Sequence, residues 1–359
     1  MHNTIRVQIG LLRETFPGER RVALTPDDVR RLAPRMTIRF EPGCGVASGH
    51  DDSAYLAAGA QSASFEDIRS RSDIILAVRQ PDIDRAPPER AILIFLGSAE
   101  AGGTSRNHPS RFNLARLAGF PDAGSMDVST TQAIICGHAA VLEAARRLGV
   151  SPSMLTIDGS FVRPIKMLAL GADASCLQAI ATARRLGAMT HAIAFSDDAQ
   201  DRIEKLGAKL LLGGISLSAN QSPADMSALR RRITPQLIDK QLIVTGATLP
   251  GARPPALIDE ETLSSLAPGT IVIDLTAADG GNCSLTEPDQ VVDIHGVRVV
   301  GLTTLASLEA AEASRLFSEG VHALLGRIVG SDGDLFLNRS DPIVRALIGP
   351  KGDAVRVAS

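Results

Sequence analysis

Residues 165–188 constrain the fold of this chain most strongly. Residues 165–170 are apolar except for Lys166, which is typical of a buried strand. Gly171 follows as a turn residue, and apolar residues then recur at helical spacing until Gly187. A strand, a glycine turn and a helix in this order are typical of the first unit of a dinucleotide-binding fold. The sequence therefore predicts an α/β domain centred on this stretch.

The glycine fingerprint of such folds, G-x-G-x-x-G, is incomplete in this stretch. Its second glycine lets the backbone approach a pyrophosphate, and its third lets the helix pack closely on the strand. Asp173 and Cys176 occupy these two positions. The Asp173 carboxylate can cap the helix itself, in place of a phosphate. A rotated Asp173, or a cation that bridges it to a phosphate, would instead leave the dinucleotide site usable.

The rest of the chain alternates strand and helix patterns, which predicts parallel sheets covered by helices. Strands are expected at residues 5–10, 36–41, 74–78, 91–96, 190–195, 209–212, 242–245, 271–275 and 297–300. Helices are expected from Thr25 and at residues 131–148, 199–206, 224–237 and 306–329. Residues 100–108 and 151–164 are expected to be loops.

The length of 359 residues suggests about two domains. We place residues 1–130 and 330–359 in an N-terminal, substrate-type domain, and residues 131–329 in a Rossmann domain of the dinucleotide-binding type. The formal net charge of -3 and the lack of a long basic run argue against nucleic acid as a partner. No apolar stretch approaches the roughly 20 residues of a membrane helix, so we expect no membrane insertion and a cytoplasmic location.

The metal-binding residue types are scattered. The 4 cysteines have no C-x-x-C spacing, and the 7 histidines are equally dispersed. Neither a disulfide framework nor a metal site is expected from such a pattern.

Several motifs together resemble the alanine dehydrogenase and NAD(P) transhydrogenase alpha-subunit family. They are RVALTPDDVRRL at 21–32, YLAAGAQ at 55–61, SMD at 125–127, LQAIATARRLGA at 177–188, VTGATLPGARPP at 244–255 and IDLTAADGGNC at 273–283. The resemblance extends over nearly the whole chain. It implies two Rossmann-like α/β domains with a cleft between them, the first domain being discontinuous.

The resemblance also implies NAD(H) as cofactor, with hydride passed to an amino or oxo acid, or to NADP on another transhydrogenase domain. A homodimer and separate transhydrogenase-type subunits are the implied protein partners. The implied cofactor-binding residues are Gly171, Asp173, Ala174, Ser175, Ala194, Gly246, Ala247 and Thr304. Ala194 stands where an acidic residue would bind the ribose, with Asp197 and Asp198 close behind. Thr304 replaces an asparagine that contacts the nicotinamide.

Other positions that serve the chemistry in the family have changed. Phe95 replaces a histidine and Ala278 an aspartate, and neither can carry a proton. Gly119 and Gly124 replace an arginine and a glutamine of the loop over the nicotinamide. Asp127 remains in that loop as the candidate catalytic residue, although it can equally begin the next helix.

Two arginines are the candidate substrate-binding residues. Arg21 matches an arginine that binds the substrate carboxylate in alanine dehydrogenase, and Arg79 matches a substrate-contacting lysine. Guanidinium groups bind carboxylates through paired hydrogen bonds, which suits a small acid. Ion pairs within the protein are the alternative explanation of both residues.

The sequence is compatible with three functions. The first is a repurposed relative that has lost hydride transfer and binds or converts a small carboxylic or amino acid. The second is a working NAD(H)-dependent oxidoreductase with a remodelled cofactor loop. The third is a non-catalytic partner subunit.

Overall fold

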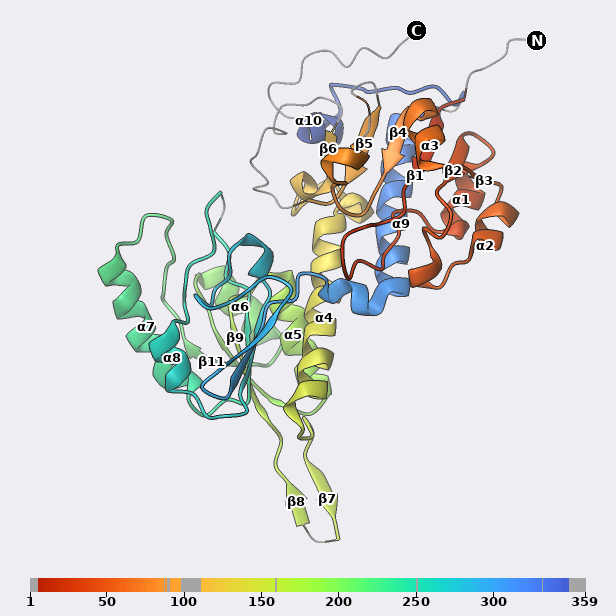
Figure 1. The fold of residues 1–359 in the computed structure, drawn as a ribbon. Coiled ribbons are helices and arrows are strands. Elements are labelled where there is room, and N and C mark those ends of the chain that lie inside the picture. Colours follow the sequence, from red (N-terminus) through yellow and green to blue (C-terminus); the bar gives the residue numbers. More distant parts are fainter. Residues whose placement is uncertain are drawn as a thin grey trace, which may run out of the picture. The chain divides into compact units, whose positions relative to one another are not determined.

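The computed structural model describes residues 6–86, 88, 91–97, 111–158, 160–249, 251–330 and 332–348. The chain separates into two compact units, which we call unit 1 (residues 1–132 and 306–359) and unit 2 (residues 133–305). Each unit contains a sheet of mainly parallel strands with helices packed on it (Figure 1). The predicted α/β class with two parallel-strand sheets is confirmed.

Unit 1 contains a six-stranded parallel sheet in the order β3-β2-β1-β4-β5-β6. Strand β1 lies between β2 and β4, so that Ile9 is opposite Ile38 on one side and Ile74 on the other. The strands are β1 (Gln8–Leu11), β2 (Thr37–Phe40), β3 (Gln61–Ser62), β4 (Ile74–Leu76), β5 (Ile92–Phe95) and β6 (Arg111–Asn113). The helices are α1 (Pro26–Leu32), α2 (Asp52–Ala57), α3 (Phe65–Arg71), α9 (Ala310–Ile328) and α10 (Pro342–Ile348).

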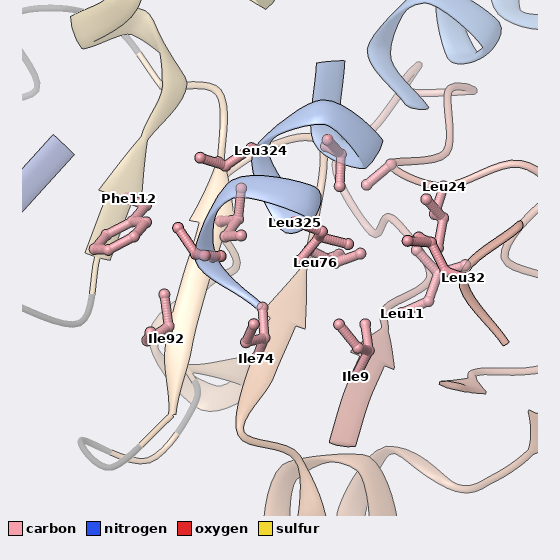
Figure 2. Close-up of a cluster of buried hydrophobic side chains, with 14 of the residues drawn as sticks. Ile9, Leu11, Leu24, Leu32, Ile74, Leu76, Ile92, Phe112, Leu324 and Leu325 are labelled. Atoms are coloured by element: carbon pink, nitrogen blue, oxygen red, sulfur yellow. The ribbon is translucent and has the colours of Figure 1, made fainter. Parts of the chain in front are cut away.

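Helix α9 supplies much of the core of unit 1. Leu324 and Leu325 are fully buried and share one apolar cluster with Ile9 and Ile74 of the sheet (Figure 2). The sequence pattern groups residues 306–329 with the Rossmann domain, whereas this helix packs in unit 1. Its periodicity indicates an apolar face but cannot say which sheet that face covers. Helix α10, in the C-terminal tail, packs in the same cluster.

Unit 2 contains a seven-stranded sheet in the order β11-β10-β9-β12-β13-β15-β14, antiparallel only between β14 and β15. The central strand β9 (Lys166–Leu170) leads through Gly171 into α5 (Ala174–Arg185), as predicted. The other strands of this sheet are β10 (Met189–Ile193), β11 (Lys209–Leu212), β12 (Leu242–Thr245), β13 (Ile271–Asp274), β14 (Val291–Ile294) and β15 (Val297–Val300). Helices α6 (Asp197–Lys205), α7 (Pro223–Leu237) and α8 (Glu260–Ser264) complete the unit, and α4 (Val128–Leu148) enters it from unit 1.

Several elements differ from the expectations. The expected loop at 151–164 contains a hairpin of β7 (Leu155–Ile157) and β8 (Ser160–Val162). Strand β14 was not predicted. It pairs with β15 through a two-residue turn, His295–Gly296, in which both residues have the positive φ that such hairpin turns require. The expected loop at 100–108 lies outside the described residues. Within the described chain, no helix has the length and apolarity needed to cross a bilayer.

Helix α4 approaches the start of α5 at Gly137. A Cβ atom on Gly137 would lie 2.0 Å from the backbone oxygen of Ser175, far inside van der Waals contact. Glycine is therefore required here by packing, in spite of its low helix propensity.

We expect Gly137→Ala to destabilise the protein by about 1–3 kcal/mol, because the added methyl group meets rigid backbone. Gly326→Ala is the matched control, since the Cβ position at this glycine of α9 has no atom within 4 Å. That change should stabilise the protein by up to about 1 kcal/mol through helix propensity. Urea unfolding followed by circular dichroism measures both. Equal effects of the two substitutions would contradict the packing argument.

Candidate functional site

The turn between β9 and α5 is the candidate cofactor site of unit 2. Gly171 has a φ of 116°, which side chains disfavour, and a Cβ there would lie 3.1 Å from the backbone of Gly246 and Ala247. The carboxyl ends of β9 and β12 therefore meet backbone to backbone. In open α/β sheets, ligands bind beyond this edge of the strands.

Asp173 caps helix α5. Its Oδ1 accepts a hydrogen bond from the Cys176 amide at 2.9 Å, and its Oδ2 accepts one from the Ser175 hydroxyl at 2.5 Å. The helix itself begins at Ala174. The N-terminus of α5 thus already carries the negative charge that it favours, supplied by its own chain.

Cys176 fills the space next to Gly246. A Cβ on Gly246 would lie 2.7 Å from Cys176 Sγ and 2.8 Å from Asp173 Oδ1, so the three groups are in close contact. Cys176 is fully buried, and burial raises the pKa of its thiol well above the ordinary value. The thiol is therefore neutral and acts here as a packing group.

The end of β10 carries no acidic side chain for a ribose. Ala194 is fully buried, and its amide donates to the Leu212 carbonyl at 3.2 Å. Asp197 and Asp198 lie in the exposed first turn of α6, where the hydroxyl of Ser196 accepts from the Ala199 amide. Both acids thus serve as the acidic first turn of a helix.

A buried network that the sequence motifs do not reveal holds the loops after β12 and β13. Asn282 Oδ1 accepts from the Ala247 amide at 2.9 Å, and its Nδ2 donates at 2.9 Å to both the Ala247 and Pro255 carbonyls. Asp274 accepts from the Cys283 amide and the Thr286 hydroxyl. The one signal in the sequence is a polar residue at the end of an otherwise apolar strand, as in I-V-I-D. The network places Ala247 firmly at the candidate site.

The remaining positions in unit 2 are turn residues. Ala278 lies in a 3₁₀ turn at Ala277–Asp279, followed by Gly280 and Gly281 with positive φ. Thr304 lies half-buried between β15 and a 3₁₀ helix at Leu305–Glu309. Among the residues described, no three histidine, cysteine or acidic side chains are grouped to hold a metal ion.

Unit 1 contains the candidate substrate residues, and the structure brings Arg21 and Arg79 together on Glu19. Arg21 Nε and Nη2 donate to the two carboxylate oxygens of Glu19 at 2.7 and 2.6 Å. Arg79 Nε donates to Glu19 Oε2 at 3.0 Å. Burial alone would raise the pKa of Glu19, but the hydrogen bonds and charge of Arg21 outweigh it and lower the pKa to about 2.

The second guanidinium, Arg79, lines a small surface pocket. Its Cζ lies 4.1 Å from the centre of the Phe16 ring, within cation–π distance. Glu14, Gln80 and Asp82 also line the pocket, whose volume is about 20 Å³. That volume suits one or two water molecules. Neither Glu14 nor Glu19 was predicted from the sequence.

Asp127 lies at the start of α4. Its Oδ1 accepts from the Thr130 amide at 3.0 Å and its Oδ2 from the Gly119 amide at 2.9 Å, so it ties this turn to the helix. Gly124 starts the preceding 3₁₀ turn, Gly124–Met126. Phe95 is buried in an apolar cluster with Ile75 and Leu93. It is a packing residue of β5.

Comparison with known proteins agrees with this fold. The profile "Alanine dehydrogenase/PNT, N-terminal domain" matches residues 10–109, and "Alanine dehydrogenase/PNT, C-terminal domain" matches residues 140–356. An NAD(P) transhydrogenase alpha subunit of Rhodospirillum rubrum is 31% identical over 353 residues, which cover 91% of each chain. The crystal structure of transhydrogenase from Sinorhizobium meliloti has a TM-score of 0.83 at 29% identity, covering 95% of this chain and 97% of that one.

A structure of L-alanine dehydrogenase shares the fold, with a TM-score of 0.74 at 21% identity over 89% of each chain. Both family profiles and the transhydrogenase relatives thus agree with the motifs in the sequence. The chain belongs to the alanine dehydrogenase/PNT family.

Proposed function

We propose that this chain is a divergent member of its family whose dinucleotide site is closed to NAD(H), and that unit 1 binds or converts a small carboxylic or amino acid. The contact between Asp173 and the Cys176 amide carries this proposal. The family is one of NAD(H)-related oxidoreductases, so the proposal concerns a lost cofactor site on a retained scaffold.

A phosphate at the N-terminus of α5 would meet the Asp173 carboxylate. Two like charges about 4 Å apart repel by roughly 4 kcal/mol at an effective dielectric of 20, or about a thousandfold in affinity. Asp173 would have to leave the Cys176 amide to avoid this repulsion. Cys176 fills space that a glycine would leave free, and the buried Ala194 offers no carboxylate to the ribose. Together these residues disfavour NAD(H).

Hydride transfer would also lack its proton carriers. Phe95 is packed in an apolar cluster, and Ala278 has no titratable group. Both oxygens of Asp127 accept backbone hydrogen bonds, so we propose that this residue orders the turn at Gly119 and transfers no proton.

Support for a small acid comes from the charges of unit 1. Arg21 and Arg79 share the carboxylate of Glu19, so two guanidinium groups converge on one acid. Arg79 lines the small surface pocket beside Phe16. We propose that Arg79 contacts the ligand and that the buried Arg21 holds Glu19 and, through it, Arg79 in place.

Two alternatives keep specific support. The 31% identity to a protein named as a transhydrogenase subunit favours a working NAD(H)-dependent oxidoreductase, with separate transhydrogenase-type subunits as partners. A non-catalytic partner subunit would share that assembly. Both alternatives predict that another protein co-purifies with this chain, whereas our proposal does not require one.

Calorimetric titration with NADH tests the closed site. We expect no binding by the wild-type protein up to millimolar NADH, and little gain from Asp173→Gly alone. The combined change of Asp173→Gly, Cys176→Gly and Ala194→Asp should restore measurable binding, because it supplies both glycines and the ribose carboxylate. Circular dichroism checks that each variant is folded. Micromolar binding by the wild type would refute the proposal.

Thermal unfolding with a panel of small amino and oxo acids tests the pocket. At least one acid should raise the melting temperature, since a ligand at 100 times its Kd stabilises a protein by about 2.7 kcal/mol. Arg79→Gln should abolish this rise. Arg30→Gln, which removes an exposed ion pair of the same unit with Asp27, should retain it. If no acid stabilises the wild type, unit 1 has no small-acid site.

We further propose a homodimer in which the hairpin of β7 and β8 contacts a second copy. The hairpin extends from the rest of unit 2 (Figure 1), and Leu155 and Phe161 on it are 41% and 72% exposed. An isolated two-stranded hairpin is marginally stable in water, so a partner surface would stabilise it.

Analytical ultracentrifugation tests the homodimer. The wild type should sediment as a dimer and Phe161→Asp as a monomer, because the new charge lies in the proposed interface. Phe336→Asp is the control, since Phe336 is another aromatic residue, 63% exposed, in unit 1. It should remain dimeric. A monomeric wild type would rule the dimer out.

A further inference from the structure

Glu14 is a second acidic residue at the pocket of Arg79. It follows β1, and its carboxylate accepts hydrogen bonds from the Val78 amide at 2.6 Å and the Arg79 amide at 3.3 Å. These two amides lie just beyond the carboxyl end of β4. Glu14 therefore lines the pocket beside the guanidinium that we assign to the ligand.

The protonation state of Glu14 sets the net charge of the groups around the pocket. Glu19, Arg21 and Arg79 lie together on one side, and the other charged residues of the pocket lining are Arg13, Asp82 and Arg85. Arg85 is itself paired with Glu41. With Glu14 ionised, the cluster of two arginines and two glutamates is neutral. With Glu14 protonated, it keeps one excess positive charge.

Burial and the charge of Glu19 raise the pKa of Glu14 to about 7, against the opposing effect of the two amides and Arg21. Its carboxyl group therefore changes charge in the neutral pH range, unlike Glu19, which stays ionised. An anion that enters the pocket would raise the pKa of Glu14 further, because like charges disfavour one another.

We propose that Glu14 is the proton-coupled residue of this pocket, so that a monocarboxylate binds beside Arg79 together with a proton on Glu14. This inference rests on the proposed small-acid site and adds the residue that makes it pH-dependent. Below about pH 7 the proton is already present in the free protein, and affinity is independent of pH. Above that, one proton must be taken up from solvent, so Kd rises up to tenfold per pH unit.

Calorimetric titration with pyruvate, which stays ionised from pH 5.5 to 9, tests the coupling. The wild type should show a constant Kd up to about pH 7 and then the tenfold rise per unit. At pH 8, buffers of different ionisation enthalpy should report uptake of one proton. Glu14→Gln should bind with no pH dependence. Glu66→Gln, which removes an exposed carboxylate of α3, should behave as the wild type.

The outcomes separate the two proposals. Binding of pyruvate by the wild type without pH dependence, or an unchanged pH profile in Glu14→Gln, overturns the role of Glu14 and leaves the small-acid site standing. Absence of binding at every pH by pyruvate and by each acid of the thermal-unfolding panel overturns both. Carbon-13 NMR of the glutamate carboxyl carbons in the wild type needs no variant: one of them should titrate near pH 7, and absence of such a titration also overturns the role of Glu14.

Discussion

Close packing around the first turn of α5 is the constraint on which unit 2 depends. Helix α4 approaches this turn so closely that only Gly137 fits against Ser175, and the loop after β12 approaches it so closely that only Gly246 fits against Cys176. Asp173 completes the turn by bonding to the Cys176 amide. A dinucleotide-binding fold usually keeps its phosphate site at this point. In this chain the same point is filled by side chains.

The fold is compatible with the loss of the dinucleotide that we propose. A phosphate at a helix N-terminus is bound by backbone amides and stabilised by the helix dipole. A carboxylate of the chain can bind to the same amides. Asn282 and Asp274 hold the neighbouring loops through hydrogen bonds within the chain. Under our proposal, the scaffold of the family persists although its cofactor site has changed.

Unit 1 depends instead on buried ion pairs, in which two arginines share one carboxylate. The side chain of Glu19 is completely buried and receives hydrogen bonds from Arg21, Arg79 and Ser307. Removing one partner of such a buried group leaves an uncompensated charge, which strongly destabilises a protein. Glu14, at the edge of this cluster, is the member whose charge changes in the neutral pH range.

The sequence predicts the α/β class and the family, because buried strands and glycine turns leave clear local patterns. It predicts Asp173 as a possible cap for the same reason, since a cap is a local feature. It misses Glu14, Glu19 and Asn282, each of which has a partner between 35 and 288 residues away. It also assigns α9 to the Rossmann domain, whereas the helix packs in unit 1, because an apolar face does not identify the sheet that it covers. The strands β3 and β6 are too short for any periodicity.

We propose that Asp173 occupies the place of the cofactor phosphate, and a crystal structure determined after soaking in millimolar NADH decides whether it does. We expect Asp173 still to accept the hydrogen bond of the Cys176 amide, with no dinucleotide density beyond β9. A pyrophosphate on the N-terminus of α5, with Asp173 turned away, would show that the site is open.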